Sequence, residues 1–120
     1  MIPTQNLLST FDDVSAFWSP RVVGRVNDQL LKVAKLKGEF VWHAHADEDE
    51  LFLVVKGVLR IQFEDHVAEL NQGDFITVPK GVRHNPVADD ECWVLLMETV
   101  STKHTGDEIT SRTKSLADQM

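Results

Sequence analysis

The hydrophobic positions of this chain occur in short runs that turn-forming residues separate. Arg21 to Val26 and Gln29 to Leu36 form two such runs around Asn27-Asp28, a pair that tolerates the left-handed backbone of a tight turn. Further runs occupy residues 40–45, 51–55, 59–63, 67–70, 75–78 and 92–100. Many short strands with Gly and Pro corners and almost no helix predict an all-β fold, an antiparallel jelly-roll β-barrel.

The polar residues within these runs predict which faces are exposed. Lys32 and Lys35 break the alternation of the second run, which indicates an edge strand that is guarded against aggregation. Arg60 and Gln62 alternate with the apolar residues of the run 59–63. They therefore share one face, which is either solvent or the wall of a cavity.

The N-terminal segment has a weak helical pattern. Within residues 1–20, Ser9 or Thr10 can cap a short helical turn that has Asp12 and Asp13 in its first turn. Three aromatic residues of this segment are expected to pack over a barrel end or a subunit interface: Phe11, Phe17 and Trp18. We expect a single domain over residues 1–120, with a barrel core at about 21–100 and a polar C-terminal tail at about 108–120.

Composition narrows the class of protein. Twelve Lys and Arg against nineteen Asp and Glu give a net charge of −7, which repels phosphate backbones and anionic lipids, so nucleic acid and membrane are not expected as partners. Cys92 is the only cysteine, in an apolar setting that predicts a buried, inert thiol. With no signal-peptide pattern and no long apolar segment, we expect a cytoplasmic protein.

Four potential metal ligands are spaced along the chain. His43 and His45 are two apart in an extended segment, so their imidazoles share one face. Glu50 heads the next apolar run, and a strand that turned back would bring it beside them. His84 follows the Pro79/Gly81 turn and is the fourth candidate. Three imidazoles and one carboxylate suit a divalent transition metal such as iron, manganese, nickel, copper or zinc.

These residues resemble the two sequence motifs of the cupin superfamily. The first motif is matched by Gly38, His43, His45, Glu50 and Gly57, and the second by Gly73, Pro79, Gly81 and His84. The chain departs from the family where four residues rather than five separate Gly38 from His43, and where Ala88 replaces a frequent asparagine. Neither departure affects a ligand of the family's metal site.

A closer resemblance to small bacterial cupins is carried by four stretches. They are W-S-P-R-V-V from Trp18, K-G-E-F-V-W-H from Lys37, V-P-K-G-V-R-H-N-P-V-A from Val78 and H-T-G-D from His104. Such proteins are often labelled "mannose-6-phosphate isomerase-like", a label that reflects the shared fold more than shown chemistry. The resemblance also implies a homodimer.

Two classes of function remain open. The resemblance implies that one metal inside the barrel leaves one or two positions for water or a small-molecule substrate, as in metal-dependent isomerases, lyases and dioxygenases. The alternative is a non-enzymatic sensor or carrier that binds a small ligand in the same pocket. A purely structural metal is disfavoured, because such sites are usually closed and rich in thiolate. Metal affinity should fall below about pH 6, since the histidines must be neutral to bind.

An enzyme needs a general acid or base near the open metal position. Four residues are available for this role: Glu98, Gln62, Arg60 and His104. Glu98 is the anomaly among them, a carboxylate within the apolar run 92–100 that needs solvent or a partner. Arg83 and Asn85 flank His84 on the opposite face and are expected to be external. The expected apolar pocket lining is Leu31, Phe52, Val54, Phe75, Leu95 and Met97.

Overall fold

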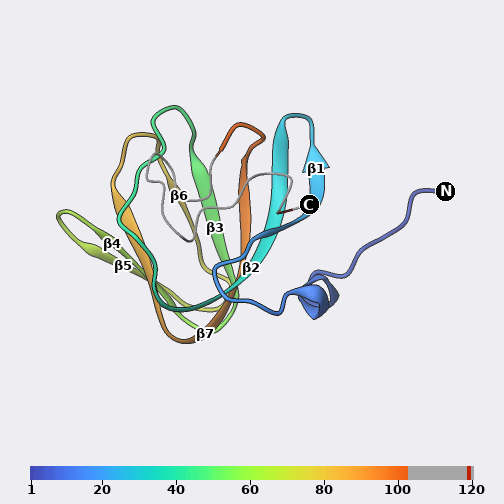
Figure 1. The fold of residues 1–120 in the computed structure, drawn as a ribbon, viewed down its shortest axis with the longest axis horizontal. Helices are drawn as coiled ribbons and strands as arrows, with labels where there is room; N and C mark the ends of the chain where they lie inside the picture. The colour runs from blue at the N-terminus through green and yellow to red at the C-terminus, as the bar shows by residue number, and fades with distance from the viewer. Residues whose placement is uncertain (103–118, 120) are drawn as a thin grey trace.

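The computed structural model describes residues 1–102 and Gln119. One short 3-10 helix, η1 (Leu8–Asp13), precedes the strands. The strands are β1 (Arg21–Val26), β2 (Gln29–Glu39), β3 (Glu50–Lys56), β4 (Leu59–Phe63), β5 (Val67–Leu70), β6 (Phe75–Val78) and β7 (His84–Thr99). Figure 1 shows these strands curving around a common interior, with the N-terminal residues running away from the body. The all-β fold predicted from the sequence is confirmed.

The long strand β7 joins the two sides of the barrel. Its first residues pair with β4, which in turn pairs with β5, while its later residues lie between β2 and β3. All seven strands of the described residues form one sheet, and every named strand pair is antiparallel. The part of it with the order β1-β2-β7-β3-β6 is called the larger sheet below, and β4 and β5 branch from β7. Because β7 pairs with strands on both sides of the barrel, residues at its two ends, His84 and Glu98, can both face the same interior.

Alternation along the three central strands divides the apolar residues between interior and exterior. The interior cluster is built from buried residues of even number on the larger sheet, namely Ala34, Leu36, Phe52, Val54, Cys92, Val94 and Leu96, together with Leu59 and Ile61 of β4. Residues of odd number, such as Val33 and Leu95, pack outside with Phe11 and Val14 of the N-terminal segment. The larger sheet is therefore apolar on both faces.

This division corrects the pocket lining predicted from the sequence. Phe52 and Val54 do line the interior. Leu31, Phe75, Leu95 and Met97 do not, because they are of odd number on strands whose interior residues are even. Phe75 is 68% exposed and Met97 is 37% exposed.

The strand β2 is not the edge strand that its lysines suggested. It lies between β1 and β7, and β1 forms the edge of the sheet. Lys32 is on the interior face and is completely buried. Lys35 is on the outer face, where its ammonium group lies 4.8 Å from the centre of the Trp93 ring. Lys32 interrupts the apolar pattern because it belongs to a buried ion pair, described below, and not because it faces solvent.

The N-terminal segment is helical at the expected place but with different ends. Leu7 caps η1 without a side-chain hydrogen bond, and Asp12 and Asp13 lie in the last turn rather than the first. Phe11 is fully buried and stacks on Trp93 with ring centroids 4.8 Å apart. It thus packs on the outer face of the larger sheet, and Phe17 is partly exposed.

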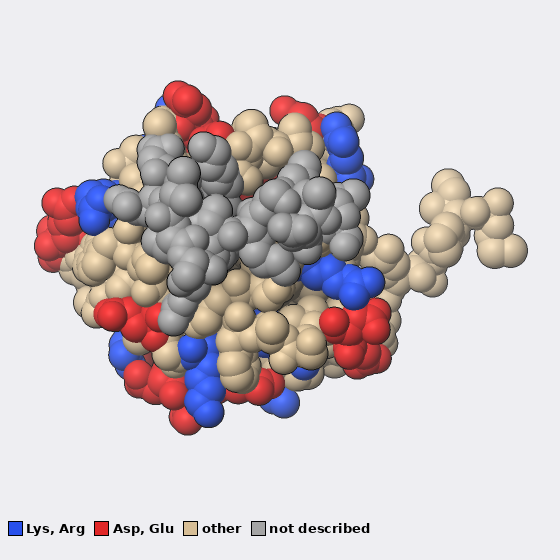
Figure 2. Space-filling view, viewed as in Figure 1, with Lys and Arg blue, Asp and Glu red and all other residues tan. Residues whose placement is uncertain are grey.

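The surface is mixed in charge. Around the margin of the face shown in Figure 2, acidic and basic side chains are interspersed, so no single sign of charge dominates there. Among the residues described, no helix has the length and apolar character needed to cross a membrane. Cys92 is fully buried, as predicted from the sequence, and burial raises the pKa of its thiol to about 11, which favours the unreactive thiol form.

Candidate metal centre

Backbone hydrogen bonds, rather than a regular strand, position the first two histidines. The segment that carries them forms only a single bridge, in which His43 and His84 exchange N–H···O bonds of 3.0 and 2.9 Å. The amide of Gly81 donates to the carbonyl of His45 at 2.7 Å. Gly81 has a φ of +80°, a conformation that glycine adopts readily and most side chains do not. The glycine of the second motif thereby fixes the loop that carries the histidines of the first motif.

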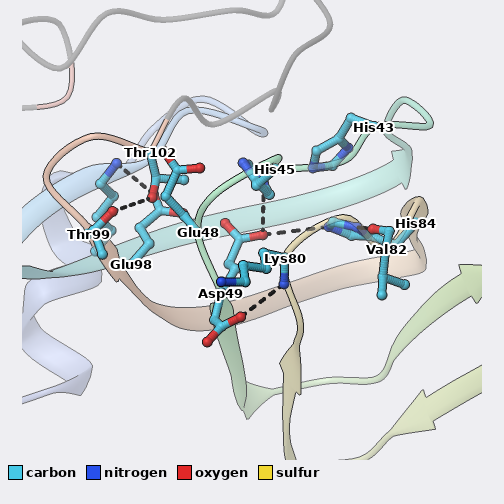
Figure 3. Close-up of polar contacts among 12 residues, drawn as sticks. His43, His45, Glu48, Asp49, Lys80, Val82, His84, Glu98, Thr99 and Thr102 are labelled. Atoms are coloured by element: carbon cyan, nitrogen blue, oxygen red, sulfur yellow. Dashed lines mark hydrogen bonds and ion pairs between the residues drawn. The ribbon is translucent and has the colours of Figure 1, made fainter.

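The four predicted ligands come together at one point. His43, His45, Glu50 and His84 are all buried, and one ligand atom from each lies within 4.8 Å of the others. Glu50 Oε1 is 3.4 Å from His45 Nε2 and 3.6 Å from His84 Nε2. In Figure 3 dashed lines mark these two contacts from His45 and His84, and His43 lies above His84 in the view. Ligand atoms bound at about 2.1 Å to a tetrahedral ion lie roughly 3.4 Å apart, so the spacing fits a metal.

The hydrogen bonds of the histidines leave their metal-binding nitrogens free. Nδ1 of His43 contacts the carbonyl of Val41, and Nδ1 of His84 contacts that of Val82, both at 2.9 Å. A proton on Nδ1 for these bonds leaves the Nε2 lone pair for a metal. The buried atoms His45 Nε2, Glu50 Oε1 and His84 Nε2 have no hydrogen-bond partner. Since buried polar atoms normally have one, a bound cation is the natural partner.

Known proteins share this architecture. A model of the cupin domain matches residues 30–97, more than half of the chain. The protein belongs to the cupin family. YdbB of Bacillus subtilis is 39% identical over 85 residues, which cover 70% of this chain and 75% of YdbB.

Two solved structures extend the likeness. A cupin-2 domain containing protein from Shewanella frigidimarina is 43% identical, with a TM-score of 0.78 over 79% of this chain and 93% of that one. The protein NMB1881 from Neisseria meningitidis is 28% identical, with a TM-score of 0.75 over 81% of this chain and 99% of that one. The resemblance predicted from the two motifs is therefore confirmed.

The cupin site holds its ligands in the protonation states that a metal needs. Burial, and then the neighbouring His84, lowers the pKa of His43 to about 4, so that this ring is neutral near pH 7. Burial alone would raise the pKa of Glu50, but its polar interactions with Glu98, His45 and His84 hold that pKa well below its ordinary value. A neutral imidazole and an ionised carboxylate are the forms that bind cations.

The residue that sequence reasoning missed in this cupin is Lys32. Its ammonium nitrogen lies 2.6 Å from Glu98 Oε1, and neither side chain is exposed. Glu98 is the cross-strand neighbour of Glu50 on the interior face. Burial and the neighbouring Glu50 raise the pKa of Glu98 well above its ordinary value, against the opposing effect of Lys32. Alternation along β2 was the available signal. Lys32 is separated from the interior residues of this strand by even numbers of positions, so it shares their face.

Two other predicted site residues lie away from the metal ligands. Phe63 pairs with His84 across β4 and β7, so Gln62 and Arg60 belong to a different face from the histidine. Gln62 accepts a hydrogen bond from Asn85 at 3.2 Å, and Arg60 pairs with Asp89. Their positions do not support the predicted catalytic role. Asn85 itself is buried rather than external, whereas Arg83 is exposed.

The remaining predictions concern the barrel end and the C-terminus. Trp18 stacks on Phe40 with ring centroids 4.6 Å apart, and its indole donates to the carbonyl of Lys37 at 2.8 Å. Both rings line a cavity of about 30 Å³ next to His43 and Glu50, which is room for one or two waters. His104 and, apart from Gln119, the predicted polar tail lie outside the described residues. Their predicted roles stay predictions.

Proposed function

We propose that this cupin is a metal-dependent enzyme acting on a small polar substrate of the carbonyl, hydroxy-acid or sugar-like class. The observation that carries the proposal is the set of buried nitrogen and oxygen atoms that converge without hydrogen-bond partners. Iron, manganese, nickel, copper or zinc would suit these donors, held by His43, His45, Glu50 and His84. When bound, such an ion supplies Lewis-acid chemistry, or redox chemistry if it is iron, as isomerases, lyases and dioxygenases use.

The chain's own residues supply positioning and proton transfer. The carbonyls of Val41 and Val82 orient two of the imidazoles, and the apolar wall that includes Phe52 and Leu96 limits water at the site. Glu98 is the acid–base group of this proposal. Burial and the neighbouring Glu50 raise its pKa well above that of an ordinary carboxyl, which suits a group that accepts a proton from a substrate and returns it.

The alternative is a non-catalytic cupin that uses the same metal pocket to bind a small ligand. The positions of Arg60 and Gln62 favour this alternative, because they remove two acid–base or polar groups from the predicted site. The enzyme is supported if metal-loaded protein turns over carbonyl or hydroxy-acid substrates and if Glu98→Gln loses this turnover while it retains the metal. Tight binding without turnover would decide for the sensor or carrier.

Metal content is the first test. We expect protein purified without added metal to contain, or to take up, about one divalent ion per chain, and His45→Ala to lose it. Elemental analysis of both proteins measures this directly. His66→Ala is the matched control, since His66 is an exposed turn residue paired with Asp65. Wild-type protein that takes up none of the five candidate metals would exclude a metalloenzyme.

The proposal includes a cytoplasmic homodimer. The absence of any possible intrachain disulfide suits a reducing compartment. Phe75 is 68% exposed on β6, the last strand in the order of the larger sheet, and an exposed apolar side chain on such a strand favours self-association. Light scattering should give twice the monomer mass for wild type and the monomer mass for Phe75→Glu. A monomeric wild type at micromolar concentration contradicts the dimer.

A further inference from the structure

Lys32 has more hydrogen-bonding capacity than its ion pair uses. An ammonium group has three donors, and its ion-pair partner Glu98 Oε1 lies 2.6 Å from the nitrogen. A second acceptor is the side-chain oxygen of Gln119, 2.5 Å from Lys32 Nζ and 87 residues away in sequence. Gln119 is itself buried. A carbonyl oxygen from near the C-terminus thus reaches a cation on the interior wall of the barrel.

This cation is close to the metal ligands. Glu98 bridges the two, because it pairs with Lys32 and is the cross-strand neighbour of Glu50. Directly opposed side chains in a sheet are about 5 Å apart at Cβ. Lys32 also lies across from Leu96 on β7, and Leu96 lines the interior cavity beside His43 and Glu50. A small ligand at the metal is therefore within reach of Lys32.

The charges of the site favour an anion once a metal is bound. The positive charges are those of a divalent ion and Lys32. The negative charges are those of the carboxylates of Glu50 and Glu98, and the histidines are neutral ligands. At least one positive charge is then left over in a buried site. Buried charge without a counter-charge is costly, so a ligand that carries one negative charge is favoured over a neutral one.

We propose that Lys32 is the anion-binding residue of this site, and that Gln119 occupies the position of a ligand carboxylate oxygen. The inference rests on the proposed metal-dependent function and specifies its substrate class, a small carboxylate such as a hydroxy acid. The interior cavity of about 30 Å³ admits only one or two waters. Gln119 accepts a hydrogen bond from Lys32, so a ligand that takes this donor must displace the Gln119 side chain, which therefore competes with the substrate.

Variants of Gln119 test this without disturbing the barrel. The affinity of zinc-loaded, full-length protein for lactate, and for the neutral analogue lactamide, is measured by calorimetry. Gln119→Ala should bind lactate at least about tenfold more tightly, because the hydrogen bond from the Lys32 ammonium to Gln119 no longer has to be broken. Gln119→Glu should bind lactate at least about tenfold more weakly, since a tethered carboxylate then competes for Lys32.

The contribution of Lys32 is isolated by a matched pair of variants. Glu98→Gln keeps the lysine, and Lys32→Met/Glu98→Gln lacks it without leaving a carboxylate unpaired. The preference for lactate over lactamide should be at least about tenfold smaller in the double variant. If Gln119→Ala binds lactate like wild type, or if the preference is equal in the matched pair, Lys32 is only the partner of Glu98 and the proposal is wrong.

Zinc content, measured separately by elemental analysis, distinguishes this proposal from the proposed function. If zinc is absent and lactate binding still depends on Lys32 and Gln119, the anion site stands and the metalloenzyme is wrong. If zinc is bound and lactate binding is independent of both residues, the metal site stands and the anion site is wrong. Absence of both zinc and Lys32-dependent lactate binding overturns both.

Discussion

Lys32→Met is expected to lower the free energy of unfolding by about 3–5 kcal/mol, because it leaves the carboxyl group of Glu98 buried without its counter-charge. Both side chains of the pair are completely buried, and their charged atoms lie 2.6 Å apart. The neighbouring carboxylate of Glu50 on β3 adds to the cost, since it repels the ionised form of Glu98. Urea denaturation followed by circular dichroism gives the difference.

A second substitution shows whether the loss comes from the charge. In Lys32→Met/Glu98→Gln the unpaired carboxylate is gone, so at least half of the lost stability should return. Lys35→Met is the matched control on the same strand, because Lys35 is half-buried on the outer face against Trp93, and a cation–π contact that is not fully desolvated contributes only about 0.5–1 kcal/mol. Equal losses for the two single variants would contradict a special role for the buried pair.

Acid should destabilise the metal-free protein through His43. The pKa of this ring is about 4 in the folded chain, against a reference value of 6.5. The unfolded chain therefore binds the proton more tightly, and stability is fully present above pH 6.5 and lost as the pH falls towards 4. The shift corresponds to about 3 kcal/mol. Urea denaturation of chelator-treated protein at several pH values between 7 and 4 measures the loss.

The ionisable groups that face His43 also influence its pKa and therefore the pH dependence measured in that experiment. They are His84, Glu50 and His45, of which Glu50 favours the protonated ring and the two histidines oppose it. Glu50 has its own lowered pKa, so it adds acid sensitivity mainly below about pH 4.5. His43→Gln removes the titrating ring, and the stability of this variant should fall about 3 kcal/mol less over the same range. Parallel pH profiles for the two proteins would contradict the assignment.

The cluster of candidate metal ligands could be predicted because the spacing of its residues is a local property. A spacing of two residues in an extended segment is enough to place His43 and His45 on one face. Gly81 forms the turn that brings His84 to them. The two sequence motifs include the turn-forming residues as well as the candidate ligands. The same local reasoning identified the 27–28 turn and the run of strands, which depend on turn-forming residues and apolar periodicity.

The pocket lining could not be predicted from periodicity alone. The strands of the larger sheet are apolar on both faces, since η1 and the residues around Trp93 cover part of the outside. Alternation then separates two faces without saying which is interior. Glu50 indicates the interior face of β3 correctly for Phe52 and Val54. Glu98 could have done the same for β7 and would have selected Leu96 and Val94 instead of Leu95 and Met97.

Short-range spacing was enough to predict the fold class, the family and the His43/His45/Glu50/His84 cluster that could hold a metal, because such spacing does not depend on the details of packing. Only the tertiary structure decided the role of Lys32. A lysine in a strand usually marks solvent, and its meaning here depends on Glu98 and Gln119, which are 66 and 87 residues away along the chain. Burial of a charge is decided by the partners that folding brings to it, and those contacts have no local signal.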